Sequence, residues 1–138
     1  METLDGEQTL ARTIWGENRG GGVPGMQSVC NTILNRVAAK SWYGDNVIDV
    51  CLKHNADGVY QFTCWSPKDP NYKKLIDLGL DGRGFESALF IARTGLMGRL
   101  LDLTGGATHY HARSILPYWA KGLKPCAEVA GHLFYRDA

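Results

Sequence analysis

The sequence predicts an α+β fold that is mainly helical and carries a small β-sheet or hairpin. Three stretches, at residues 5–17, 24–40 and 85–101, repeat apolar residues at the spacing of one helix face. Two short stretches, at residues 107–111 and 128–135, instead show features of a strand or hairpin. Because the 138 residues contain no internal repeat or low-complexity tract, we expect the whole chain to form one domain.

The composition of the chain limits the classes of partner that the protein is expected to bind. The hydrophobic fraction of 44% and the charged fraction of 21% are ordinary for a soluble globular protein, and a net charge of +1 does not favour nucleic acid. No apolar run approaches the roughly 20 residues of a membrane span. The four cysteines form no CxxC pair, which argues against a zinc ribbon, and Cys30 is expected to be a small buried hydrophobe.

The first two predicted helices have clear boundaries. Asp5, with Gln8 three residues later, is typical of an N-cap with a capping box. Three glycines at residues 20–22 end this helix, and Pro24 suits the first turn of the next. The second helix reaches about Lys40 and has the strongest apolar pattern, so we expect it to be the core helix.

The middle of the chain is rich in turns. The link at residues 41–46 is expected to expose two aromatic side chains, Trp42 and Tyr43, and residues 47–53 fit either a short helix or a strand. A turn at residues 55–58 precedes a predicted strand at residues 59–63.

A proline-containing loop at residues 65–70 leads to a short predicted helix at residues 71–78 and a linker at residues 79–84. The third long helix is expected to end at residue 101, before a break at residues 102–106. Beyond it, the final hairpin is expected to turn at Gly131.

Glu17 is the first candidate for chemistry. It lies in the last turn of the first predicted helix, where the helix dipole is negative and opposes a carboxylate. The dipole and any apolar cover would raise its pKa, which is what a general acid needs near neutral pH. The alternative is a solvated glutamate or one paired with Arg19.

Histidines offer a second candidate. His109 and His111 share one face of a predicted strand, where they could bind zinc with a third ligand. No HExxH or comparable ligand run accompanies them, so we expect no metal and no other cofactor. A GxSxG elbow is missing as well, and the glycines at residues 20–22 lack the ending of a phosphate loop.

Aromatic and polar residues recur in the segments between the helices, as in a carbohydrate-binding groove. Core packing is an equal explanation for these aromatic residues. The set comprises Trp42, Tyr43, Tyr60, Gln61, Trp65, Tyr110, Tyr118 and Trp119.

Five blocks together carry a family resemblance. Residues 11–20 (ARTIWGENRG) are similar to the A-x-x-I/V-x-x-E-A-R-G segment of the SleB/CwlJ-type cell wall hydrolases. The likeness continues through residues 33–37 (ILNRV), 61–63 (QFT), 102–110 (DLTGGATHY) and 131–135 (GHLFY), in the family's order. Departures are Asn18 for the usual alanine, Leu103 for a proline, and an unusual loop from Cys64 and Trp65 onward.

The resemblance implies a lysozyme-like domain that cleaves the β-1,4 bond between N-acetylmuramic acid and N-acetylglucosamine in peptidoglycan. Glu17 would be its catalytic acid and then its base. Two-carboxylate glycosidases need a second acid within about 5–10 Å. Because none of Asp45, Asp57 and Asp102 is compelling, and Asp102 fits a turn cap, we favour a single-glutamate lytic transglycosylase over a hydrolysing muramidase.

The resemblance also suggests a substrate groove. Gln61, Tyr110 and His109 are the expected groove residues that orient the N-acetyl group or stabilise charge. Phe62, Asn35 and Trp65 are expected to contribute to substrate binding, and Arg19 is expected to anchor the turn after Glu17.

The N-terminal residues show neither a basic region nor an apolar region of a signal peptide. We therefore expect a monomeric protein made in the cytoplasm, similar to a phage or prophage endolysin, which reaches the cell wall with the help of a holin. The alternatives are a non-catalytic peptidoglycan-binding or phage structural module and, on the histidines alone, a metal-dependent amidase.

Overall fold

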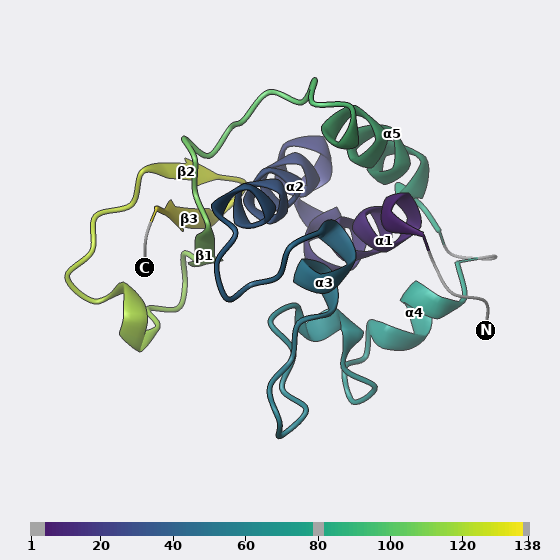
Figure 1. The fold of residues 1–138 in the computed structure, drawn as a ribbon, viewed down its shortest axis with the longest axis horizontal. Helices are drawn as coiled ribbons and strands as arrows, with labels where there is room; N and C mark the ends of the chain where they lie inside the picture. Colours follow the sequence, from purple (N-terminus) through teal and green to yellow (C-terminus); the bar gives the residue numbers. More distant parts are fainter. Residues whose placement is uncertain (1–4, 79–81, 137–138) are drawn as a thin grey trace.

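The computed structural model describes residues 5–78 and 82–136. Three helices form its centre: α1 (Gly6–Asn18), α2 (Gly22–Ala39) and α5 (Phe85–Leu96), each of which contacts the other two (Figure 1). Residues 1–4, on which part of the signal-peptide expectation rests, and residues 79–81 of the predicted linker lie outside the described residues.

The first helix begins as predicted. The Asp5 carboxylate accepts a hydrogen bond from the Gln8 backbone N–H at 2.8 Å, which satisfies one of the free donors of the first turn. The Gln8 side chain instead accepts a bond from Arg12, at 3.1 Å. Leu10 and Ile14 are fully buried, so the predicted apolar face is the one that packs into the core.

The second helix confirms the expected core helix. Its fully buried residues include Ile33 and Cys30, and it ends at Ala39 with Lys40 in the left-handed conformation at φ 50°. A short 3-10 turn, η1 (Arg19–Gly21), joins it to α1.

Two further helices lie against α1. Residues 47–53, which fitted a helix or a strand, form the helix α3 (Val47–Leu52), because the Asn46 side chain caps the Asp49 N–H at 2.9 Å. The short helix α4 (Tyr72–Ile76) lies within the predicted range, and both contact α1.

Three local predictions are wrong. Residues 59–63 form no strand: Tyr60 makes one isolated bridge to His54, and the chain then turns into the 3-10 helix η2 (Thr63–Trp65). The third long helix ends at Leu96, not residue 101, because Gly98 takes a φ of 73° and leaves the helix.

Tyr43 is the third difference. It was expected to be exposed with Trp42, but it is buried against Arg36, whose guanidinium carbon lies 4.8 Å from the ring centre. Trp42 is exposed as predicted.

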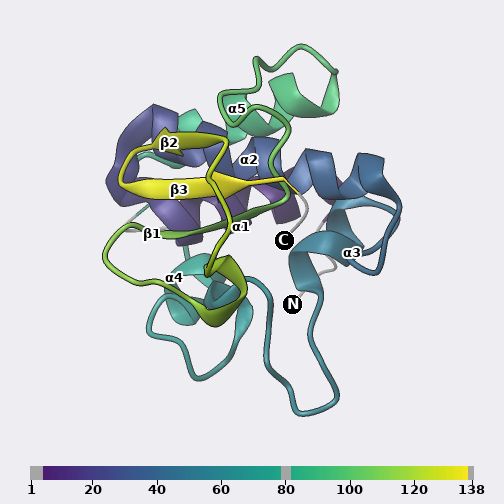
Figure 2. The same cartoon turned by 90° about the vertical axis from the view of Figure 1, so that its left-hand side faces the viewer.

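The sheet has three antiparallel strands: β1 (His109–Ala112), β2 (Ala127–Val129) and β3 (His132–Tyr135). Figure 2 shows β3 between the other two. The predicted final hairpin is confirmed, and Ala130 and Gly131 both take positive φ as its two-residue turn requires.

The sheet lies at the end of the molecule that also holds the C-terminal part of α2 (Figure 1). The long connection from β1 to β2 contains one 3-10 turn, η3 (Tyr118–Ala120). This mainly helical arrangement with one small sheet is the predicted fold class. Among the described residues, none of the helices combines the length and the hydropathy needed to span a membrane.

Candidate active site

Glu17 lies in the last turn of α1, as predicted, and two distant segments contact its carboxylate. The Tyr110 hydroxyl donates a hydrogen bond to Oε1 at 2.9 Å, and the Cys64 backbone N–H donates to Oε2 at 3.4 Å. The carboxylate is therefore held between the first helix, the η2 turn and strand β1.

Gly16 explains how the η2 turn comes so close to α1. A Cβ atom at this position would lie 3.0 Å from the Cys64 Cβ and 2.7 Å from a methyl group of Leu75. Only a glycine lets these two side chains pack directly on the helix. The Trp65 indole N–H adds a bond to the Thr13 hydroxyl at 2.8 Å, which fixes the turn to the same helix.

The pKa of Glu17 is raised above its ordinary value. Burial is the largest cause, since it penalises the charged carboxylate, and the charge of Asp69 acts in the same direction. The hydrogen bonds from Tyr110 and Cys64 oppose the shift because they favour the ionised form. The environment thus holds a proton on Glu17 at a higher pH than an exposed glutamate would keep it.

The Arg19 guanidinium contacts groups other than the Glu17 carboxylate, so it does not form the ion pair with Glu17 that was the alternative. Its guanidinium donates to the Asn71 side chain at 2.8 Å and to the Trp15 carbonyl at 3.3 Å, and it stacks on the Trp15 ring at 4.2 Å. These contacts agree with the expected role of anchoring the turn after Glu17.

Tyr110 is itself well supported. Its ring packs against His132 and Phe134 of the neighbouring strand, with ring centres 5.4 and 5.5 Å away. Burial and the charge of Glu17 raise the pKa of Tyr110 well above its ordinary value. The phenol therefore keeps its proton and can always donate to the carboxylate.

The other predicted site residues do not converge on Glu17. The Asn35 amide donates to Asp102 at 3.1 Å and to the Ala107 carbonyl at 2.9 Å, so it joins α2 to the segment before β1. Asp102 caps a turn, as expected, and accepts bonds from the N–H groups of Thr104 and Gly106.

The segment at residues 61–65 divides into exposed and buried parts. Gln61 is exposed, whereas Phe62 and Trp65 are only 2% and 6% exposed and belong to the core. The Arg36 guanidinium carbon lies 5.4 Å above the Phe62 ring. Phe62 and Trp65 therefore support the site by packing in the core.

His109 and His111 share a face of β1, as predicted, and both pack on Trp119, at 5.3 and 5.7 Å between ring centres. His111 is held by the Ala112 carbonyl and the Tyr135 hydroxyl, each at 2.8 Å. Across the described ranges, no three histidine, cysteine or acidic residues form a group that could hold a metal ion.

Three participants were not among the predicted site residues. The Cys64 backbone N–H and the charge of Asp69 act on Glu17 without any side-chain pattern that could have revealed them. Arg36 is only 6% exposed, and its guanidinium donates to the Thr108 carbonyl at 2.7 Å. Burial lowers the pKa of Arg36, and the charge of Glu17 opposes this shift. A charged residue on the apolar face of the core helix was the available signal for Arg36.

Comparisons with known proteins identify the family and the fold. The family model described as cell wall hydrolase matches residues 20–135, a range that begins three residues after Glu17. Among solved structures, the catalytic domain of the germination-specific lytic transglycosylase SleB from Bacillus anthracis is similar, with a TM-score of 0.70 and 24% identity. The match covers 96% of this chain and 95% of that one, and it establishes a shared, lysozyme-like fold.

A comparison with curated protein sequences found no match. The family model nevertheless spans most of the sequence, and the five blocks of the predicted resemblance lie in order on one fold. The chain therefore belongs to the SleB/CwlJ-type cell wall hydrolase family.

Proposed function

We propose that this protein cleaves peptidoglycan glycan strands at the β-1,4 bond between N-acetylmuramic acid and N-acetylglucosamine, with Glu17 as general acid and then base. The observation that carries the proposal is the environment of Glu17. Burial raises the pKa of its carboxyl group, while Tyr110 and the Cys64 N–H donate hydrogen bonds that favour the ionised form. Membership of the cell wall hydrolase family supports the substrate class.

In the first step, the protonated Glu17 gives its proton to the glycosidic oxygen as positive charge develops at C1 of the muramyl ring. The bond between C1 and that oxygen breaks, and the leaving sugar departs with a new hydroxyl. Glu17 is then a carboxylate, which the hydrogen bonds from Tyr110 and Cys64 stabilise.

In the second step, the Glu17 carboxylate removes the proton from the muramyl 6-hydroxyl, whose oxygen attacks C1. The product is a 1,6-anhydromuramyl end, and Glu17 regains its proton without consuming water. The hydrolytic alternative would use the same carboxylate to activate a water molecule and would leave a reducing end.

The surroundings of the three carboxylates considered above as a second acid favour the first outcome. Burial alone would raise the pKa of Asp102, but hydrogen bonds from Thr104, Asn35 and Gly106 together lower it. The Asp102 carboxylate is thus engaged in capping its own turn. Asp45 and Asp57 are exposed. Asp69 acts on Glu17 through its charge and accepts the Asn71 N–H at 2.8 Å, so it is the carboxylate that the hydrolytic alternative would use. The similar SleB catalytic domain, which belongs to a lytic transglycosylase, supports the same choice.

For substrate binding, we propose direct sugar contacts for Gln61, which is exposed, and for His109, which is half-buried on the opposite face of β1 from Tyr110. Asn35, Phe62 and Trp65 would act indirectly, by holding the surrounding segments. An endolysin-like, monomeric protein released with a holin, in which residues 1–138 form one catalytic domain, stays part of the same proposal.

The test is digestion of purified peptidoglycan by the wild type and by Glu17→Gln, with mass spectrometry of the products. We expect anhydromuramyl ends from the wild type and a loss of about 10²-fold or more in the variant, because glutamine keeps the shape but has no acidic proton. Reducing muramyl ends would make the enzyme a hydrolysing muramidase. Equal rates for both proteins would show that Glu17 is not the acid.

The same assay separates the rival functions. A metal-dependent amidase would release peptides instead of glycan fragments and would lose activity in a chelator. A non-catalytic binding module would retain wall binding but release no fragments, and Glu17→Gln would change nothing.

A further inference from the structure

A pocket of about 510 Å³ lies between two loops next to the candidate active site. One loop follows α3, the other begins in the η2 turn, and Figure 1 shows both at the lower edge of the molecule. This loop pocket is lined by residues 57–60, residue 63 and residues 66–70. Its volume is within the range of about 300–1,000 Å³ that is usual for small-ligand sites.

Two residues of the loop pocket connect it to Glu17. Asp69 lines the pocket, and its negative charge acts on the Glu17 carboxyl group. Thr63 also lines the pocket and directly precedes Cys64, whose backbone N–H donates to the Glu17 carboxylate at 3.4 Å. A glycan strand held with one bond at Glu17 therefore has the loop pocket beside it.

Both loops are fixed by their own hydrogen bonds. In the first loop, the Asn55 side chain accepts the Val59 N–H at 3.0 Å. In the second loop, the Asp69 N–H donates to the Ser66 carbonyl at 2.9 Å, and Pro67 restricts the backbone within that turn. A ligand would therefore pay little entropy to order these walls.

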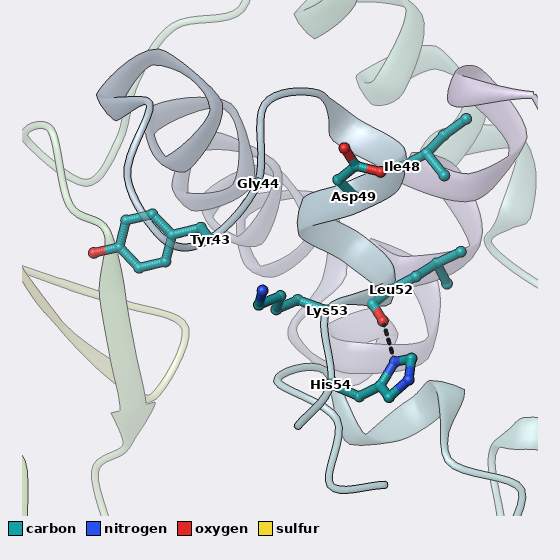
Figure 3. Close-up of a pocket in the computed structure, with 7 residues that line it drawn as sticks. All are labelled: Tyr43, Gly44, Ile48, Asp49, Leu52, Lys53 and His54. Carbon is teal, nitrogen blue, oxygen red and sulfur yellow. Dashed lines mark hydrogen bonds between the residues drawn. The ribbon is translucent and has the colours of Figure 1, made fainter. Parts of the chain in front are cut away.

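Tyr60 gives the loop pocket an aromatic wall. Its half-buried ring packs on the His54 ring, at 4.6 Å between ring centres, and the two residues form an isolated β-bridge. Figure 3 shows the His54 ring held in turn by the Leu52 carbonyl, at 2.9 Å. Tyr60 lines the loop pocket, whereas His54 supports it from outside. An aromatic side chain held in this way offers a surface on which a sugar ring can pack.

The polar groups of the loop pocket fit an uncharged sugar. Thr63 and Ser66 contribute hydroxyl groups, which can donate and accept hydrogen bonds. Asp57 and Asp69 contribute carboxylates, which accept hydrogen bonds from sugar hydroxyls. Lys68 is the one cation among the described lining residues, so two negative charges face one positive charge. Such a lining opposes a negatively charged ligand.

We propose that the loop pocket binds an N-acetylglucosamine ring of the glycan strand and rejects the muramyl ring. The inference rests on the proposed function, because it takes peptidoglycan as the substrate. The muramyl ring bears a lactyl group that carries either its own carboxylate or a peptide stem with carboxylates, whereas N-acetylglucosamine is uncharged. Because the two rings alternate, a pocket that accepts only one of them sets which bond of the strand lies at Glu17.

Binding of sugars without cleavage tests the loop pocket directly. N-acetylglucosamine should shift the amide NMR signals of Asp57, Gly58 and Thr63, and N-acetylmuramic acid at the same concentration should leave them in place. Equal shifts with the two sugars would overturn the choice of ring.

Variants then locate the bound sugar, with the Kd for N-acetylchitotriose as the measured quantity. Tyr60→Ala should raise this Kd about three- to tenfold, because the sugar loses its aromatic wall. Thr63→Val keeps the shape of an exposed side chain, removes one hydroxyl and should raise the Kd about two- to tenfold. Tyr118→Ala, a control at a tyrosine that is 87% exposed and outside the pocket, should keep the wild-type Kd.

The two proposals fail in different ways. An unchanged Kd in both Tyr60→Ala and Thr63→Val would overturn the pocket assignment, even where the wild type cleaves peptidoglycan. Release of no fragments from peptidoglycan by the wild type would instead overturn the proposed function, even where N-acetylchitotriose binds in the loop pocket.

Discussion

Two glutamates on the same helix have opposite surroundings. Glu7 lies in the first turn of α1, where the helix dipole favours a negative charge, and it pairs with Arg93 of α5 at 2.7 Å on the protein surface. Glu17 lies in the last turn, where the dipole opposes a carboxylate, and its partners are a phenol and a backbone N–H. The comparison teaches that burial and uncharged partners, not residue type, prepare a carboxyl group for acid catalysis.

The largest expected difference between the two glutamates is in activity. Glu17→Gln should lower kcat by about 10²-fold or more, whereas Glu7→Gln should leave kcat within about twofold of the wild type, because only the first variant removes the transferred proton. Initial rates on purified peptidoglycan would measure both. Similar losses in the two variants would show that Glu17 has no special role as the acid.

Tyr110→Phe should have the next largest effect, about a tenfold loss of kcat, because the ionised Glu17 loses a hydrogen bond. That bond lowers the pKa of Glu17, so its removal should raise the pKa further. Since Glu17 must be protonated to act as an acid, the alkaline limb of the kcat–pH profile should move to higher pH. A move to lower pH would contradict the role assigned to Tyr110.

A smaller effect concerns stability. Because burial raises the folded-state pKa of Glu17, ionisation costs stability at neutral pH, and this cost disappears below the ordinary glutamate pKa of about 4.3. Glu17→Gln should therefore raise the Tm at pH 7 and leave it nearly unchanged at pH 4. Thermal unfolding at the two pH values measures this, and a lower Tm at pH 7 would show that the carboxylate stabilises the fold.

The smallest effect is expected at the surface pair. Glu7→Gln should destabilise the protein by about 0.2–1 kcal/mol, because the Arg93 side chain is largely exposed and solvent screens the attraction. The difference should shrink in 1 M salt. Urea unfolding at low and high salt would measure it, and a loss that salt does not reduce would indicate packing instead of charge.

The sequence predicted the parts of the fold whose signal is local. The Asp5 cap and the apolar faces of the first two helices depend on neighbours within a few residues, and the structure has them as expected. The predicted strand at residues 59–63 was wrong because alternation cannot show whether a partner strand exists. The burial of Tyr43 was equally hidden, because it depends on a cation seven positions earlier in the sequence, Arg36.

The candidate site shows the same limit. Glu17 and Tyr110 were predicted, and the structure brings them together. The N–H of Cys64 could not be predicted, because every residue except proline has such a donor and only tertiary packing selects one. Gly16 is a similar case: a glycine within a helix carries no sign of the close approach that it permits.

The contacts of Glu17 span long distances along the chain, 47 residues to Cys64 and 93 to Tyr110. Tyr110 is in turn held by β3, which comes later in the chain than either partner. The raised pKa of Glu17 is consequently a property of the assembled tertiary structure and not of helix α1 alone. A fragment without β3 would keep the glutamate but lose the strand that positions Tyr110 against it.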